Sequence, residues 1–145
     1  MIELSKVGPV YTVTMNNGEN MICLDWQKRM LEILDQLEQN PVAGTAMVLV
    51  GEGKFFSNGL NLELLNKLDG AGWTLFSAQM NEIHRRMLML PFPTVAAVNG
   101  HAFAGGAFMA LSCDYRIMRQ DRGWICISEV DAGVPLPQGM MEFLL

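Results

Sequence analysis

The stretch from Pro93 to Asp114 reads PTVAAVNGHAFAGGAFMALSCD, and its order of residue types predicts the local fold. A short run of β-branched and small apolar residues, Thr94–Val98, precedes an Asn99-Gly100 turn. Small residues from Ala102 to Ala107 then lead directly into an apolar helical segment. A strand, a tight turn and a glycine-opened helix leave backbone N–H groups pointing outward from the helix N-terminus. The stretch therefore predicts a site for negative charge on a phosphate, a carboxylate or an enolate oxygen.

The composition is typical of a single globular domain, which we expect to span residues 1–145. Half of the chain is hydrophobic, 17% is charged, and the formal net charge is −5. An acidic chain of this kind argues against non-specific binding to nucleic acid or to an anionic membrane surface. We see neither a signal-peptide pattern at the N-terminus nor an apolar run of transmembrane length.

The three cysteines show neither disulfide nor metal-ligand spacing, and we expect Cys23, Cys113 and Cys126 to be small core residues. Sparse, unpaired thiols are typical of a reducing compartment, so we predict a cytoplasmic protein. The sequence leaves the mitochondrion and the peroxisome open as alternatives.

Strand and helix patterns alternate along the chain, which predicts an α/β fold of repeated ββα turns. Alternating residues around Gly8-Pro9 predict a hairpin, and Ala46–Val50 reads as a strand buried on both faces. Helical spacing of apolar residues predicts a helix capped by Asp25 and ended before Pro41, and a long helix that ends near Leu90. Further expected elements are a short helical segment to about residue 68, a strand over 115–118, an extended run over 124–127 and an apolar helix from residue 140.

Three segments together resemble the enoyl-CoA hydratase/isomerase superfamily, also called the crotonase family. Residues 53–62 (GKFFSNGLNL) are similar to the family's F-S-[AN]-G-x-D-L segment, and residues 99–114 to its N-G-x-[AC]-x-G-G-G-x-x-[LM]-x-x-x-C-D segment. Residues 128–137, from Ser128-Glu129-Val130 to Pro137, are similar to P-E-x-x-L-G-x-x-P. Each segment alone is weak evidence for the family, because glycine turns are common, but the order and spacing of all three agree with the family.

The resemblance implies a spiral of ββα turns with a cleft that binds an acyl-CoA thioester and needs no further cofactor. Family members are longer than this chain. Residues 1–145 would be the N-terminal spiral core without the mostly helical C-terminal region that closes the acyl site. That region also supports trimers, which often pair into hexamers, so the resemblance implies a homotrimer or hexamer.

The resemblance also implies two backbone N–H groups that stabilise a thioester enolate, and by position these belong to Leu60 and Gly105. Lys54, Ser57, Asn58 and Gly59 would bind CoA, mainly through backbone groups, with Lys54 reaching a phosphate. The alternatives stay open at this point. In the alternative interpretation, Gly59, Gly105 and Gly106 serve only turns and close helix packing, and Lys54 is a solvated charge.

The acid–base residues decide which reaction the family fold performs. Hydratases of the family hold a water between two glutamates, one of them three residues after the glycine that matches Gly105. Here that position is Phe108, which would line a dry acyl site, and Glu129 matches the other glutamate if one residue is inserted in the loop over residues 119–123. One carboxylate suits moving a proton between two carbons. The resemblance thus implies a Δ3,Δ2-enoyl-CoA isomerase of fatty-acid β-oxidation, with Glu129 as base and then acid.

Several alternatives remain at this stage. The protein could instead be a hydratase, another acyl-CoA enzyme of the family, or a non-catalytic acyl-CoA-binding relative, and Glu129 could be a loop carboxylate. We expect Asp131 to be structural, with a second polar role in the site as its alternative. We predict no metal site, because the two histidines lack ligand partners at useful spacing. Our remaining structural expectations concern four positions: His84 partly exposed on a helix, His101 structural, Asp114 paired with Arg116, and Asn61 changing a local helix cap.

Overall fold

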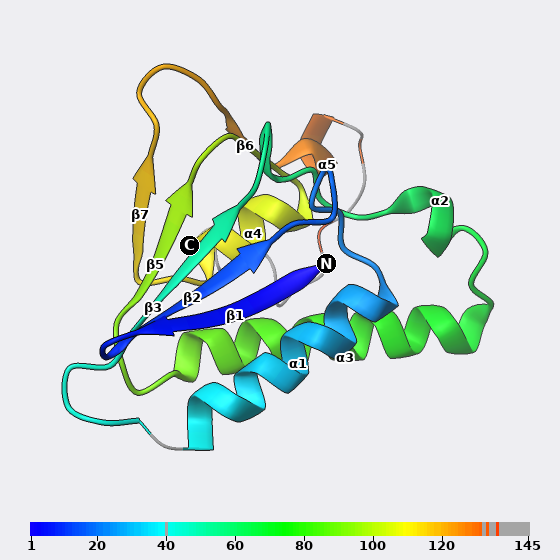
Figure 1. Cartoon of the computed structure of the whole chain (residues 1–145). Helices are drawn as coiled ribbons and strands as arrows, with labels where there is room; N and C mark the ends of the chain where they lie inside the picture. Colours follow the sequence, from blue (N-terminus) through cyan, green and yellow to red (C-terminus); the bar gives the residue numbers. More distant parts are fainter. Residues whose placement is uncertain (40, 132, 134–135, 137–145) are drawn as a thin grey trace.

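The computed structural model describes residues 1–39, 41–131, 133 and 136, and two sheets organise this part of the chain (Figure 1). The predicted helix from Met140 lies outside the described residues. The elements in chain order are β1 (Ile2–Val7), β2 (Val10–Met15), α1 (Leu24–Gln39), β3 (Ala46–Gly51), β4 (Phe55–Ser57), α2 (Leu62–Leu65), α3 (Gly70–Met89), β5 (Thr94–Val98), β6 (His101–Phe103), α4 (Gly105–Leu111), β7 (Tyr115–Met118), β8 (Ile125–Cys126) and α5 (Ser128–Asp131).

The larger sheet has the strand order β1-β2-β3-β5-β7. β1 and β2 form the predicted antiparallel hairpin, in which Gly8 takes a positive φ of 58° at the turn. β2, β3, β5 and β7 run parallel to one another, and helical segments separate them along the chain, as the alternating pattern predicted. The α/β fold of ββα turns is therefore confirmed.

The helices α1 and α3 run side by side and form the core with one face of this sheet (Figure 1). On β3, Met47 and Leu49 are fully buried in that core, whereas Val48 and Val50 are only half-buried. The prediction that β3 is buried on both faces is thus wrong for its second face. Continuous apolar composition does not tell which face a helix covers.

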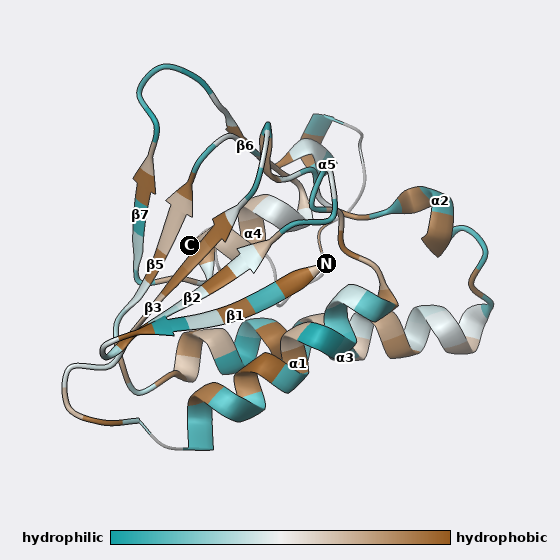
Figure 2. Ribbon diagram, viewed as in Figure 1, coloured by the Kyte–Doolittle hydropathy of each residue, from teal (hydrophilic) through white to brown (hydrophobic). Residues whose placement is uncertain are grey.

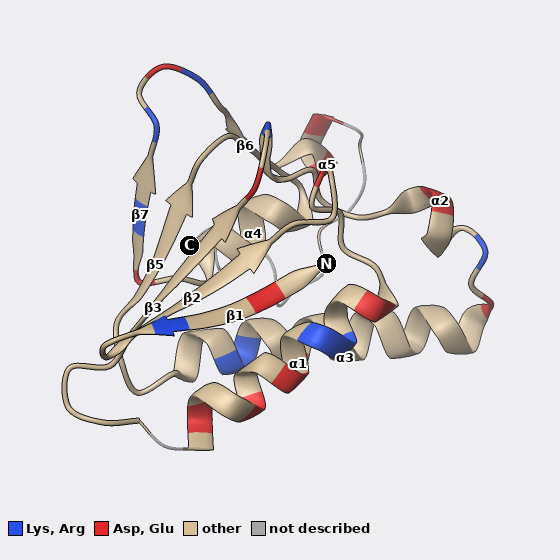
Figure 3. Cartoon of the chain, in the orientation of Figure 1, with Lys and Arg blue, Asp and Glu red and all other residues tan. Residues whose placement is uncertain are grey.

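The amphipathic character of α1 follows the predicted spacing, and Figure 2 shows hydrophobic and hydrophilic residues alternating along it. The helix begins at Leu24, so Asp25 lies in its first turn instead of capping it. On the solvent side, Arg86 of α3 donates hydrogen bonds of 2.8 Å to both Asp35 and Glu38 of α1. Figure 3 shows the acidic residues of α1 and the basic residues of α3 in this layer. The apolar residues of α1 that the structure buries are Trp26, Met30, Ile33, Leu34 and Leu37.

The smaller sheet contains the parallel strands β4, β6 and β8 in that order. The sequence predicted an extended run near β8 but read the residues of β6 as part of a small-residue stretch. β6 exists because Ala102 pairs with Ile125 and His101 pairs with Phe55, both distant in sequence. The short apolar helix α4 follows β6 directly, as predicted. Within the described part of the chain, no helix is long and apolar enough to cross a membrane.

Candidate functional site

One predicted site residue from each family-like segment lies at the same edge of the β4-β6-β8 sheet. Because these strands are parallel, their carboxyl ends lie at the same edge, which is where α/β folds bind ligands. Leu60 follows β4, Gly105 follows β6, and Glu129 follows β8. The Ala104 N–H donates a 2.9 Å hydrogen bond to the Cys126 carbonyl, which ties the start of α4 to the strand that leads to Glu129. The fold thus gathers Leu60, Gly105 and Glu129 at one edge of this sheet, whereas Lys54 precedes β4 and lies at the opposite edge.

The backbone of Leu60 is fixed by an isolated parallel bridge to Ile22. The Ile22 N–H donates to the Gly59 carbonyl and the Asn61 N–H donates to the Ile22 carbonyl, each at 2.8 Å. Among the described residues, no acceptor is found for the Leu60 N–H. A backbone donor that is held in place and left unpaired is what an oxyanion site requires.

Gly59 and Gly105 come close enough to link the first two segments. Gly59 has a φ of +82°, and a Cβ built on it would lie 3.5 Å from the Gly105 nitrogen and 2.7 Å from the Phe103 carbonyl oxygen. Gly105 is the first residue of α4, so its N–H has no acceptor within the helix. The two predicted oxyanion donors therefore lie on neighbouring pieces of backbone.

Ala104 is strained at the position just before the predicted donor. Its φ of 48° and ψ of −122° form a conformation that favours glycine, although the residue carries a side chain. The family-like pattern has three successive glycines here, and Ala104 occupies the place of the first. Strain of this kind costs about 1–3 kcal/mol and concentrates at functional sites.

Glu129 lies in the short helix α5 and is half-buried. Its Oε2 atom is buried and has no hydrogen-bond partner among the described residues. Asp131 is exposed at the end of the same helix. Buried carboxylate oxygens are normally paired, so an unpaired one is typical of a group reserved for a ligand or for proton transfer. The Glu129 side chain is therefore partly shielded from solvent.

Phe108 is fully buried on α4, and its ring packs edge-on against His84 of α3 at a centroid distance of 6.5 Å. His84 is 3% exposed, so the expectation of a partly exposed histidine is wrong. Its Nδ1 lies 2.7 Å from the Ser112 Oγ, whose hydroxyl donates to the Phe108 carbonyl at 2.8 Å. Since that hydroxyl has one proton, we assign the proton on His84 to Nδ1. Burial lowers the pKa of His84 from 6.5 to about 4, so the ring is neutral at pH 7.

The predicted CoA-binding residues take three different environments. The Ser57 side chain is fully buried, donates to the Asn20 carbonyl at 2.7 Å and accepts from the Gly59 N–H at 3.2 Å, so it supports the loop. Asn58 donates to a Glu19 carboxylate oxygen at 2.7 Å. Lys54 is exposed, with its Nζ 5.1 Å from the centre of the Phe55 ring.

Of two further expectations, the capping role of Asn61 is confirmed and the Asp114–Arg116 pair is not found. Asn61 caps α2 by accepting a 3.1 Å hydrogen bond from the Leu64 N–H, which confirms its capping role. The predicted Asp114–Arg116 pair is wrong. Asp114 accepts hydrogen bonds from the N–H and hydroxyl of Thr94, while Arg116 donates to the Cys113 carbonyl at the end of α4. Both side chains satisfy nearby backbone groups instead of each other.

The sequence missed Asn20, which is fully buried with a positive φ of 56°. Its side-chain amide donates hydrogen bonds to the backbone carbonyls of Glu52 and Phe55, and its backbone carbonyl accepts one from the Ser57 hydroxyl. Asn20 thus holds the loop that carries the first predicted donor. An asparagine in a turn gives no sequence signal for such long-range contacts.

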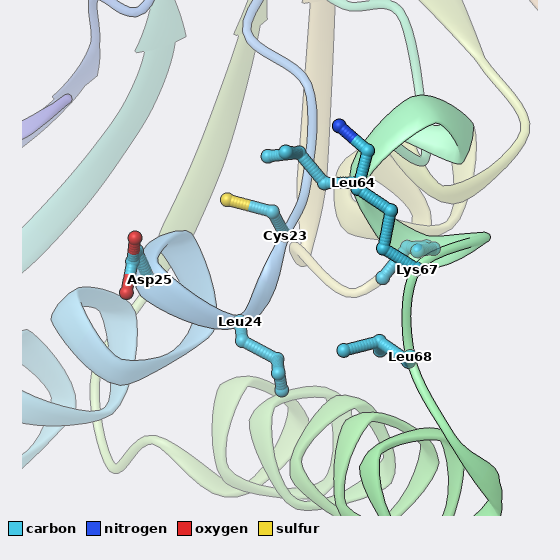
Figure 4. Close-up of a pocket in the computed structure, with 7 residues that line it drawn as sticks. Cys23, Leu24, Asp25, Leu64, Lys67 and Leu68 are labelled. Carbon is cyan, nitrogen blue, oxygen red and sulfur yellow. The ribbon is translucent and has the colours of Figure 1, made fainter.

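The sequence also missed a hollow of about 310 Å³ between the start of α1 and α2 (Figure 4). The leucines at and after α2 are visible in the sequence, but only the fold places them opposite α1. Within the described chain, no group of three or more His, Cys, Asp and Glu side chains is placed to hold a metal ion. The hollow is lined by Cys23, Leu24, Asp25, Leu64, Leu65, Lys67 and Leu68.

Comparison with known proteins agrees with this geometry. Residues 6–145 match the family model described as enoyl-CoA hydratase/isomerase. The chain is 38% identical to enoyl-CoA delta isomerase 3 of Arabidopsis thaliana, with 94% of this chain and 59% of that protein covered. It is 34% identical to a short-chain-enoyl-CoA hydratase of Clostridium acetobutylicum, with 79% of this chain and 44% of that protein covered.

Among solved structures, an enoyl-CoA hydratase from Bacillus anthracis superposes with a TM-score of 0.76 at 25% identity. That match covers 83% of this chain and 48% of the other chain. The chain therefore spans between 44% and 59% of the length of the relatives named here. The matched family model and the shared fold show that this chain belongs to the enoyl-CoA hydratase/isomerase family and has the crotonase fold.

Proposed function

We propose that the intact protein converts 3-enoyl-CoA thioesters to trans-2-enoyl-CoA thioesters, with Glu129 as its single acid–base group. The observation that carries this proposal is Phe108, a fully buried phenyl ring at the α4 position where a hydratase of the family would have a glutamate. Three relatives named enoyl-CoA delta isomerases, at 38%, 36% and 35% identity, support it.

The proposed reaction moves one proton and one double bond within the substrate. The Glu129 carboxylate removes a proton from C2 of the 3-enoyl thioester, and the electron pair delocalises onto the thioester oxygen and the existing double bond. The protonated Glu129 then returns the proton at C4, which leaves the double bond between C2 and C3. The step is redox-neutral and consumes no co-reactant, so we expect no cofactor beyond the CoA of the substrate.

The N–H groups of Leu60 and Gly105 supply the electrostatic part of the proposal. Negative charge develops on the thioester oxygen in the enolate, and preorganised donors that point at that oxygen lower the barrier. Each such donor typically contributes about 2.7–4 kcal/mol. The strained backbone at Ala104 supports this role, because it fixes the direction of the donor that follows.

The test is the isomerase activity of the intact protein with 3-hexenoyl-CoA, comparing the wild type with Glu129→Gln. General acid–base catalysis by one side chain is worth about 10²–10⁴-fold, so we expect kcat to fall by that factor. Asp131→Asn is the matched control, since Asp131 lies exposed on the same short helix. A Glu129→Gln variant that keeps the wild-type rate would show that the base is another residue.

Hydration is the second candidate, and it is favoured by the 34% identical short-chain-enoyl-CoA hydratase of Clostridium acetobutylicum. A hydratase would form 3-hydroxyacyl-CoA from trans-2-hexenoyl-CoA in the absence of any 3-enoyl substrate. Mass spectrometry of the products distinguishes the two reactions, because isomerisation leaves the mass of the thioester unchanged and hydration adds the mass of one water.

We further propose the features that the family resemblance implies for the whole protein. These are CoA binding by Lys54 and the backbone of Ser57–Gly59, assembly as a homotrimer or hexamer, and a role in fatty-acid β-oxidation. Sparse thiols support the cytoplasmic assignment. A relative at 36% identity is named as peroxisomal, which makes the peroxisome the alternative to test by localisation of the tagged protein.

A further inference from the structure

The Ser57 hydroxyl lies at the junction of the two segments that carry the predicted oxyanion donors. Ser57 is the last residue of β4, and its side chain is fully buried. It donates its single proton to the Asn20 carbonyl at 2.7 Å, so its oxygen is left to accept the Gly59 N–H at 3.2 Å. The hydroxyl therefore belongs to the framework that holds the backbone and is shielded from the reacting groups.

Gly59 is held at both of its backbone polar groups. Its N–H donates to the Ser57 Oγ, and its carbonyl accepts a 2.8 Å hydrogen bond from the Ile22 N–H. The Leu60 N–H belongs to the same peptide unit as that carbonyl and points in the opposite direction, because a peptide unit is planar and trans. Ser57 and Ile22 together thus fix the direction of the Leu60 N–H.

The helix α4 packs directly on Ser57 from the other side. A Cβ built on Gly106 would lie 2.4 Å from the Ser57 carbonyl oxygen and 2.7 Å from the Ser57 Cβ. Gly106 lies inside α4, so this glycine is required by the close approach and not by a turn. The residue before it is Gly105, the second predicted donor. Ser57 therefore contacts the neighbours of both donors.

We propose that Ser57 is a positioning residue that sets the spacing between the Leu60 and Gly105 N–H groups. The inference rests on the proposed acyl-CoA function of these two donors. Two N–H groups stabilise one oxyanion only when both lie about 2.7–3.1 Å from it, and a misplacement of about 1 Å can cost about 10²-fold in rate. Loss of the hydroxyl leaves the Gly59 N–H without its acceptor and lets the Leu60 backbone shift relative to α4.

The first test compares the isomerisation of 3-hexenoyl-CoA by the intact wild type, Ser57→Ala and Ser57→Cys. Ser57→Ala misplaces a donor without removing it, so we expect kcat to fall about 10–100-fold, compared with about 10²–10³-fold for a lost donor. The Kd of saturated hexanoyl-CoA should stay close to the wild-type value, because little charge develops on the oxygen in the ground state. Ser57→Cys keeps a weak donor and acceptor, so its kcat should lie between the other two.

Ser112→Ala is the matched control. Ser112 is also a buried serine, and its hydroxyl donates to the Phe108 carbonyl at the end of α4 that is remote from Gly105. This variant loses a similar hydrogen bond and should keep the wild-type kcat. Gly106→Ala disturbs the Ser57 contact from the α4 side and should lower kcat. A wild-type kcat in Ser57→Ala or Gly106→Ala, or an equal loss in Ser112→Ala, would overturn the proposal.

Infrared difference spectroscopy separates the role of Ser57 from the isomerase function. Hexanoyl-CoA with an isotopic label at the thioester carbonyl should show a lower stretching frequency when bound to the wild type, because the two donors polarise that bond. Ser57→Ala should give a smaller shift, and Ser112→Ala the wild-type shift. Equal shifts in both variants, or an unshifted carbonyl in the wild type, would contradict the proposal. The measurement needs binding without turnover, so an inactive protein that shows the Ser57 effect refutes only the isomerase function.

Discussion

His84 provides a sharp test of the fold, because this histidine is buried and should make stability depend on pH. Its pKa falls from 6.5 to about 4 on folding, since burial removes water from the charged ring. Between these values the unfolded chain binds a proton that the folded chain does not. Stability is therefore fully present above pH 6.5 and is lost as the pH falls toward 4.

The size of the effect follows from the same two values. A shift from 6.5 to about 4 corresponds to about 3 kcal/mol once the whole interval is crossed. Between pH 7 and pH 5 the linkage relation gives a loss of about 2 kcal/mol from His84 alone. Most carboxyl groups titrate below this interval, so it isolates the histidine contribution.

The assay is urea denaturation of the intact protein at pH 7, 6 and 5, comparing the wild type with His84→Gln. We expect His84→Gln to lower stability at pH 7 but to lose about 2 kcal/mol less than the wild type on going to pH 5. Equal losses of stability in His84→Gln and the wild type between pH 7 and pH 5 would show that the burial of His84 does not cause the pH dependence.

Three further substitutions test backbone strain and a buried hydrogen-bond acceptor by chemical denaturation. Gly59→Ala should lower the free energy of unfolding more than Gly18→Ala does. Both glycines have a φ near +80°, at which a side chain costs about 1–2 kcal/mol. The methyl group at position 59 would in addition meet a backbone oxygen at 2.7 Å, whereas the one at position 18 would meet no atom within 4 Å. Equal losses would remove the steric argument. Ala104→Gly should stabilise the protein by about 1 kcal/mol, because it relieves a positive φ at a smaller entropic cost, and a destabilised variant would contradict the assigned strain. Asp114→Ala should cost about 1–3 kcal/mol, because two donors at the start of β5 lose their acceptor, and an unchanged stability would show that water replaces it.

Much of the fold could be predicted from local patterns. The hairpin, the long helices and the strands β3, β5 and β7 each carry a periodicity or a turn signal within their own residues, and they occur where predicted. The order of the three family-like segments also predicted which residues belong together. Leu60, Gly105 and Glu129 indeed follow the three strands of one small parallel sheet.

The errors share one cause, which is that burial and pairing depend on residues far away in sequence. His84 has a helix-surface pattern, yet Phe108 and Ser112 enclose it. Strand β6 has no strand signal of its own and forms because β4 and β8 flank it. The second face of β3 is less buried than its apolar composition suggested, because the core lies on one side of the sheet.

The sequence by itself determined the class of fold, the family and the identities of the residues at the predicted site, because these follow from residue types at fixed spacing. Only the tertiary structure decided what those residues can do. Among the described residues, it left the Leu60 N–H without an acceptor and the buried Glu129 Oε2 without a hydrogen-bond partner, and it turned the Ser57 side chain into the loop. It also formed the hollow between Cys23 and Leu68. Each of these depends on the packing of segments that lie far apart in the chain, and periodicity carries no information about such contacts.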